Sequence, residues 1–194
     1  FLNCGQIKFS TPSSWVEYEE KYGDGRDEEC TKFLNTIKEE KIADKVEEVY
    51  LNETFKIDNI NCEILGVKNP EITTNAINNS SMVIKMNTGK NDILFLGDTG
   101  VESGEKLLKN QSEKLKVDIL QMAHHGQSGV SKEVYDFIKP TICLWPTPDW
   151  LWINDSGSGE DSGPWKTKET RQWMEELNIT NNIIEKDDNI KISI

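Results

Sequence analysis

The middle of the sequence alternates between two apolar patterns, and this alternation constrains the fold more than any other feature. Residues 92–96, 117–122 and 141–145 are short apolar runs of the length typical of buried strands. Residues 103–115 and 130–138 carry apolar side chains at helical spacing. Strand, helix, strand, helix, strand is the order found in βαβ units. The sequence therefore predicts a layered α/β domain.

Helical spacing is also present in the first forty residues, and strand patterns follow. Residues 13–42 have apolar side chains at helical spacing among many charges, interrupted by Gly23-Asp24-Gly25, which predicts two amphipathic helices joined at the glycines. Residues 49–51 and 55–57 are short strand candidates. Residues 60–65 alternate between apolar and polar side chains, as a half-buried strand does.

A hairpin is predicted just before the βαβ units, and further elements after them. Residues 82–86 form an apolar run, and a glycine-containing turn leads from it into the next strand. A long loop at 146–164 is rich in Gly, Ser, Asp and Trp. Residues 166–177 have the spacing of a helix, and 183–184 with 190–194 are predicted to form a closing hairpin. The 194 residues are predicted to form a single domain.

Composition excludes some partners. Thirty-four acidic and twenty-two basic residues give a net charge of −12. Such a chain repels a phosphate backbone, so a nucleic-acid partner is disfavoured. No apolar run approaches the roughly 20 residues that a membrane helix needs, so no membrane segment is predicted. The four cysteines lack a C-x-x-C spacing and are predicted to be buried apolar side chains. The compartment stays open: cytoplasmic, or secreted with the signal outside this chain.

Polar residues follow two of the predicted strands at the point where each strand ends. Gly97-Asp98 follows residues 92–96, and His124-His125, the only histidines in the chain, follow residues 117–122. Carboxylate and neutral imidazole groups are zinc ligands, and bound zinc lowers the pKa of water enough to provide hydroxide at neutral pH. The alternative is an ordinary turn-forming aspartate and two hydrogen-bonded histidines. Because adjacent residues of an extended backbone point to opposite sides, the two imidazoles are not expected to bind the same ion.

The order of these motifs resembles the metallo-β-lactamase fold hydrolase superfamily. Within it, the chain is most similar to the branch of competence-protein hydrolase domains and phosphorylcholine esterases. An Asn/Ser-rich entry to a strand (78–83), a strand to Gly-Asp (93–98) and Val-Asp-Ile-Leu leading to His-His-Gly (117–128) carry the resemblance, which continues loosely over 164–177. It implies part of an αββα sandwich: a mixed sheet with helices on the outer face.

The resemblance also implies roles for the polar residues at the strand ends. Asp98 would bridge two zinc ions and take part in catalysis, and His125 would complete the shell of one ion. His124 would be catalytic, touching substrate or helping to protonate a leaving group. The substrate would be a small molecule or a phosphoester.

One motif of the superfamily is absent from the sequence. No H-x-H-x-D-H is present, and two histidines are too few for a complete pair of zinc sites. Two explanations stay open. Residues 1–194 are either the N-terminally truncated, C-terminal part of a metal-dependent hydrolase, or a degenerate binding domain without catalysis. On either explanation this chain alone is expected to bind zinc poorly or not at all and to be inactive.

Tryptophans gather in and beside the long loop after the last βαβ strand. Because the faces of such rings attract cations, Trp150, Trp152 and Trp165 are candidate substrate-binding residues. Core packing and loop anchoring are the alternative roles. An exposed edge of a partial sheet could also pair with a neighbour, which makes an oligomer a further expectation.

Overall fold

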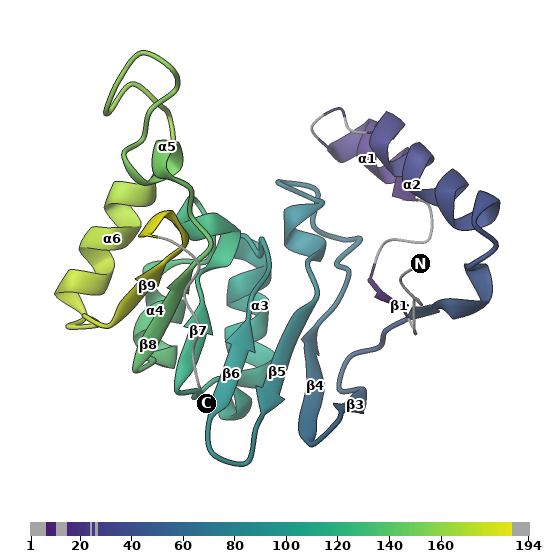
Figure 1. Cartoon of the computed structure of the whole chain (residues 1–194), viewed down its shortest axis with the longest axis horizontal. Helices are drawn as coiled ribbons and strands as arrows, with labels where there is room; N and C mark the ends of the chain where they lie inside the picture. Colours follow the sequence, from purple (N-terminus) through teal and green to yellow (C-terminus); the bar gives the residue numbers. More distant parts are fainter. Residues whose placement is uncertain (1–6, 11–14, 24, 26, 188–194) are drawn as a thin grey trace.

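A seven-stranded mixed sheet forms the centre of the protein (Figure 1). The computed structural model describes residues 7–10, 15–23, 25 and 27–187. Neighbouring strands follow one another in chain order, antiparallel from β3 to β6 and parallel from β6 to β9. The strands are β3 (Thr54–Ile57), β4 (Ile60–Gly66), β5 (Val83–Asn87), β6 (Asp92–Phe95), β7 (Ile119–Gln121), β8 (Ile142–Trp145) and β9 (Asn182–Ile184). The predicted α/β class, the mixed sheet and the β5–β6 hairpin are confirmed.

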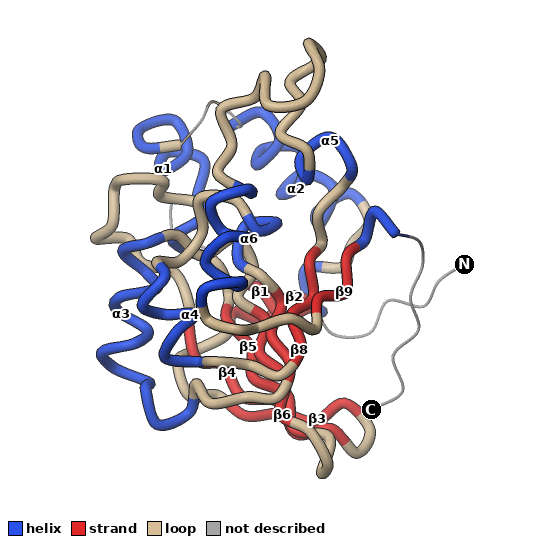
Figure 2. Tube along the Cα trace, turned by 90° about the vertical axis from the view of Figure 1, so that its left-hand side faces the viewer, coloured by secondary structure: helices blue, strands red, loops and turns tan. Residues whose placement is uncertain are grey.

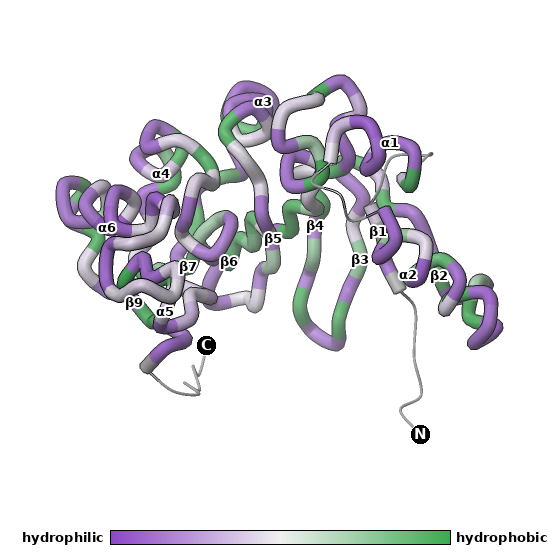
Figure 3. The backbone as a smooth tube through the Cα atoms, turned by 90° about the horizontal axis from the view of Figure 1, so that it is seen from above, coloured by the Kyte–Doolittle hydropathy of each residue, from purple (hydrophilic) through white to green (hydrophobic). Residues whose placement is uncertain are grey.

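Three helices cover one face of this sheet, as the views from the side and from above show (Figures 2 and 3). They are α3 (Val101–Gln111), α4 (Lys132–Ile138) and α6 (Thr167–Glu176). Alternate strand residues such as Leu94 and Leu120 are fully buried in one apolar cluster with Leu107, Val134 and Met174 of the helices. Burying each large apolar side chain stabilises the fold by about 1.5–3 kcal/mol. This cluster holds the parallel strands in place, and thereby also positions the loops that follow their carboxyl ends.

The N-terminal elements lie beyond the β3 end of the sheet (Figure 3). The two predicted helices are confirmed as α1 (Trp15–Tyr22) and α2 (Asp27–Glu39). A two-stranded parallel sheet joins β1 (Ile7–Phe9) to β2 (Val46–Glu48). The strand predicted at 49–51 is wrong, because these residues enter a turn in which the Glu53 amide donates to the Tyr50 carbonyl at 3.0 Å.

The remaining segments adjust several predictions. The long loop at 146–164 contains a short helix, α5 (Asp149–Trp152). Strand β9 pairs parallel with β8, and the predicted partner strand at 190–194 lies outside the described residues. Cys30, Cys62 and Cys143 are buried free thiols, as predicted, and Cys4 lies outside the described residues.

Short 3-10 helices complete the chain: η1 (Ala43–Lys45), η2 (Asn78–Ser80), η3 (Ser112–Lys114), η4 (Ala123–Gly126) and η5 (Glu185–Asp187). Within the described ranges, every helix is too short or too polar to cross a bilayer.

Candidate metal centre

The loops that follow β6 and β7 meet at one edge of the sheet. Because β6 and β7 are parallel neighbours, their carboxyl ends lie side by side. The His124 amide donates to the Gly97 carbonyl at 2.9 Å, which fastens the second loop to the first. Asp98 and both histidines are thereby brought together, although 26 positions separate Asp98 from His124.

The closest pair at this edge is Asp98 with His125. Asp98 Oδ1 lies 3.7 Å from His125 Nε2, and both side chains are partly exposed. His125 Nδ1 lies 2.8 Å from the Pro146 carbonyl, which only accepts, so Nδ1 carries the proton and donates it. Nε2, the other ring nitrogen, faces Asp98. Two zinc ligands at about 2.0–2.2 Å from a tetrahedral ion lie roughly 3.4 Å apart, close to the observed separation.

The backbone at the two histidines is not extended, and this corrects the geometry expected from the sequence. Both residues have positive φ, 48° at His124 and 56° at His125, and Gly126 follows at 77°. Left-handed backbone is strained at the two histidines, though not at the glycine, and such strain concentrates at functional sites. The two rings nonetheless diverge, with centroids 6.2 Å apart and planes inclined by 54°. Only His125 is paired with Asp98 by a contact below 4 Å.

His124 has a different environment from His125. Its Nδ1 atom is buried and makes no hydrogen bond within the described residues, and its Nε2 lies 3.5 Å from Asn78 Nδ2. Burial lowers the pKa of His124 below its ordinary value of 6.5. The Asp98 carboxylate opposes this effect, the His125 ring reinforces it, and the Ser128 backbone opposes it more weakly. The imidazole of His124 is therefore neutral at pH 7.

Several residues that support the site were not identified from the sequence. Gln121 accepts hydrogen bonds from the amides of Leu96 and Gly97 at 3.0 and 2.9 Å. The Ser81 hydroxyl accepts from the Asp98 amide at 3.1 Å. The Asn/Ser-rich segment before β5 was noted as a motif, but only the fold shows that Asn78 and Ser81 reach this edge.

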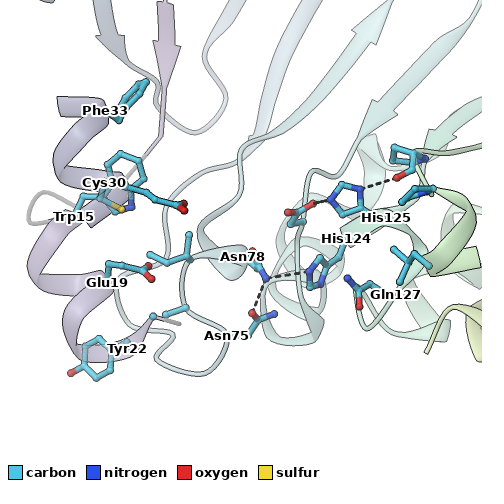
Figure 4. Close-up of a pocket in the computed structure, with 18 of the residues that line it drawn as sticks. Trp15, Glu19, Tyr22, Cys30, Phe33, Asn75, Asn78, His124, His125 and Gln127 are labelled. Atoms are coloured by element: carbon cyan, nitrogen blue, oxygen red, sulfur yellow. Dashed lines mark hydrogen bonds and ion pairs between the residues drawn. The ribbon is translucent and has the colours of Figure 1, made fainter. Parts of the chain in front are cut away.

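A cavity of about 890 Å³ opens beside the pair and extends to the N-terminal helices. In Figure 4, Trp15, Cys30 and Phe33 stand on one side of it, and His124, His125 and Gln127 on the other. No sequence pattern indicated this opposing wall. Among the described residues, the charged side chains that line the cavity, apart from the histidines, are all acidic: Glu19, Glu29, Asp98 and Glu185. The Asp98 and Glu185 carboxylates favour a cation here over an anion.

The tryptophans predicted to bind substrate divide into two groups. Trp150 lines the cavity and is 47% exposed, and its ring packs edge to face on Trp165 at 4.8 Å. Trp165 does not line the cavity. Trp152 does not line it either: its ring packs on the buried Trp145 at 5.4 Å, with the Arg171 guanidinium 4.1 Å from its centroid. A role in substrate binding stays a prediction for all three.

Zinc requires more donor atoms than the described residues bring together at this edge. Asp98 and His125 offer two suitable atoms in a suitable orientation, whereas protein zinc sites use at least three protein ligands. Among the described residues, no group of three or more His, Cys, Asp or Glu side chains could hold a metal ion. Within the described part of the chain, Asp98 and His125 therefore do not make a complete zinc site.

Comparison with known proteins gives one informative similarity. No protein-family model matches the chain. Over 104 residues, 54% of this chain, the sequence is 32% identical to ComE operon protein 3 of Bacillus subtilis (strain 168). The matched region is 13% of that protein's length, so the chain spans a small part of the relative it matches. The similarity is consistent with the competence-protein branch that the motifs indicate.

Proposed function

We propose that this chain provides one part of the active site of a metal-dependent hydrolase with two zinc ions. The observation that carries the proposal is the orientation of His125, whose Nε2 faces Asp98 Oδ1 at 3.7 Å while Nδ1 donates to Pro146. A carbonyl that fixes the tautomer of a histidine is typical of metal-ligating imidazoles. The remaining ligands would come from outside the described residues of this chain.

The residues of this chain would have distinct tasks. Asp98 and His125 would hold metal, and bound zinc would supply hydroxide at neutral pH. His124 lines the same cavity and is paired with Asn78 instead of Asp98. Because its ring is neutral at pH 7, it would orient substrate or the leaving group through a hydrogen bond rather than through a positive charge.

The acidic lining of the cavity bears on the substrate. A phosphoester is an anion and would be repelled by the Asp98 and Glu185 carboxylates that line the cavity unless metal ions offset their charge. The net charge of −12 adds a general repulsion of long phosphate polymers. These charges support a small molecule or a single phosphoester as substrate over a nucleic acid.

A noncatalytic binding domain is the second candidate. It is favoured by the absence of three metal-ligating side chains at one place among the described residues. A cavity of about 890 Å³ with an aromatic wall would suffice to bind a ligand without chemistry.

Substitutions in the protein expressed from its full open reading frame separate the two functions. Metal content and hydrolysis of a chromogenic phosphodiester are measured for Asp98→Ala, His125→Ala and His124→Ala. Asp98→Ala is expected to remove metal, and His125→Ala to weaken one site. His124→Ala should keep the metal and lower turnover by about 100-fold or more. Asp136→Ala, at an exposed position on α4, is the control and should change neither.

Two results would contradict the proposal. Equal loss of metal from the two histidine variants would overturn the separate roles of His124 and His125. A full-length wild-type protein with neither metal nor turnover would exclude the hydrolase and leave the binding domain.

A further inference from the structure

The carboxamide of Gln121 joins the two loops that carry the candidate ligands. Gln121 is the last residue of β7 and is half-buried. Its Oε1 accepts from the amides of Leu96 and Gly97 at 3.0 and 2.9 Å. Its Nε2 donates to the carbonyl of Gly97 at 3.4 Å and to that of Met122. One side chain thus satisfies two donors and two acceptors of the backbone.

These bonds converge on Gly97, the residue directly before Asp98. The Gly97 amide is held by Gln121, and its carbonyl accepts from both Gln121 and the His124 amide. Gly97 has a φ of 58°, and a side chain there would meet Ser81 at 3.2 Å. The turn that aims Asp98 is therefore held by contacts with β7 and not by regular strand pairing.

We propose that Gln121 is a positioning residue that sets the separation of Asp98 from His125, and through it the affinity for metal. The inference rests on the proposed function of this site. Gln121 does not line the cavity, so within the described chain it acts on the site only through the backbone it holds. A carboxamide suits the task because it both donates and accepts, whereas a carboxylate cannot donate and a thioether does neither with any strength.

Gln121→Met tests the proposal in the full-length protein, because it keeps the length of the side chain and removes its hydrogen bonds. Amide hydrogen exchange, measured in the presence of a chelator on peptides that cover Leu96 and Gly97, should become roughly 10- to 100-fold faster. Zinc affinity, measured by competition with a chelating dye, should fall by about 10- to 100-fold.

The matched control is Gln111→Met. Gln111 is a buried glutamine that, like Gln121, has a hydrogen-bonded carboxamide, which donates to Asn52 Oδ1 at 3.2 Å, but it lies at the end of α3. This variant should lower thermal stability without changing either readout at the site. If Gln121→Met does not fold, Gln121→Asn takes its place, because it keeps the amide but shortens its reach, and the same two losses are expected.

The outcomes separate the two proposals. Unchanged exchange at Leu96 and Gly97, or faster exchange with wild-type zinc affinity, would overturn the positioning role of Gln121. Equal effects of the Gln121 and Gln111 variants on zinc affinity would also overturn it. A wild-type protein that binds no zinc would contradict the proposed function instead, and the exchange rates would still decide whether Gln121 holds the turn.

Discussion

An added methyl group at Gly126 should strongly destabilise the histidine turn, the left-handed segment formed by His124, His125 and Gly126. A Cβ there would lie 2.4 Å from both Cε3 and Cζ3 of Trp145. The indole cannot move aside easily, because it is 2% exposed, donates from Nε1 to Asn182 Oδ1 at 2.7 Å and packs on Trp152. Gly126 also has a φ of 77°, in the left-handed region that an L side chain rarely adopts.

Gly126→Ala is destabilising for two reasons, the left-handed backbone and the contact with Trp145, and a second variant separates the two. A left-handed alanine costs about 1–2 kcal/mol. Overpacking a filled core costs about 1–3 kcal/mol more, so Gly126→Ala should lower the free energy of unfolding by about 2–5 kcal/mol. Gly89→Ala isolates the first cost, because Gly89 has a φ of 84° and nothing within 4 Å of the added Cβ. The entropy lost by the unfolded chain is common to both variants and cancels in their difference.

The assay is urea denaturation of both variants, followed by tryptophan fluorescence, with thermal melts as a second measure. Each kcal/mol corresponds to about 2–4 °C in Tm for a chain of this length. The expected difference between the two variants is about 1–3 kcal/mol, with Gly126→Ala the less stable. Equal destabilisation would refute the contact between the histidine turn and Trp145 on which this reasoning depends.

Two further predictions concern the surroundings of the same turn. Because the pKa of His124 in the folded state lies below 6.5, the unfolded chain binds the proton more readily, so the free energy of unfolding should fall as the pH is lowered through 6.5. Urea denaturation above and below that pH should show a smaller fall for His124→Gln than for wild type, and an equal fall would contradict the burial of this ring. Asn182→Ala leaves the Trp145 indole N–H without its acceptor and should lower the free energy of unfolding by about 1–3 kcal/mol. The control is Asn181→Ala, at the exposed neighbouring position. If Asn182→Ala lowers the free energy of unfolding no more than this control does, the hydrogen bond to Trp145 contributes nothing to stability.

The order of elements was predictable because each signal is local. Apolar runs and helical spacing indicated β6, α3, β7, α4 and β8, and the rule that parallel strands end at one edge then placed Asp98 near the histidines. The same local signals failed at 49–51. There, a short apolar segment was interpreted as a strand, and it did not reveal that Glu53 would close a turn onto Tyr50.

The finer geometry of the site depends on contacts between distant residues, which no local pattern contains. The left-handed conformation of His124 and His125 depends on packing of Gly126 against Trp145 and on the bond from Thr147 to the His125 carbonyl. Likewise, Gln121 lies within a predicted strand, and the hydrogen bonds of its side chain to Leu96 and Gly97 become visible only once β6 and β7 are placed side by side.

The central claim is that Asp98 and His125 bind one metal ion, and anomalous diffraction at the zinc edge tests it most directly. Crystals of the full-length protein grown with zinc are predicted to show a peak about 2.0–2.2 Å from both Asp98 Oδ1 and His125 Nε2. Ordered zinc bound elsewhere, with these two side chains making only the direct contact seen at 3.7 Å, would contradict the claim.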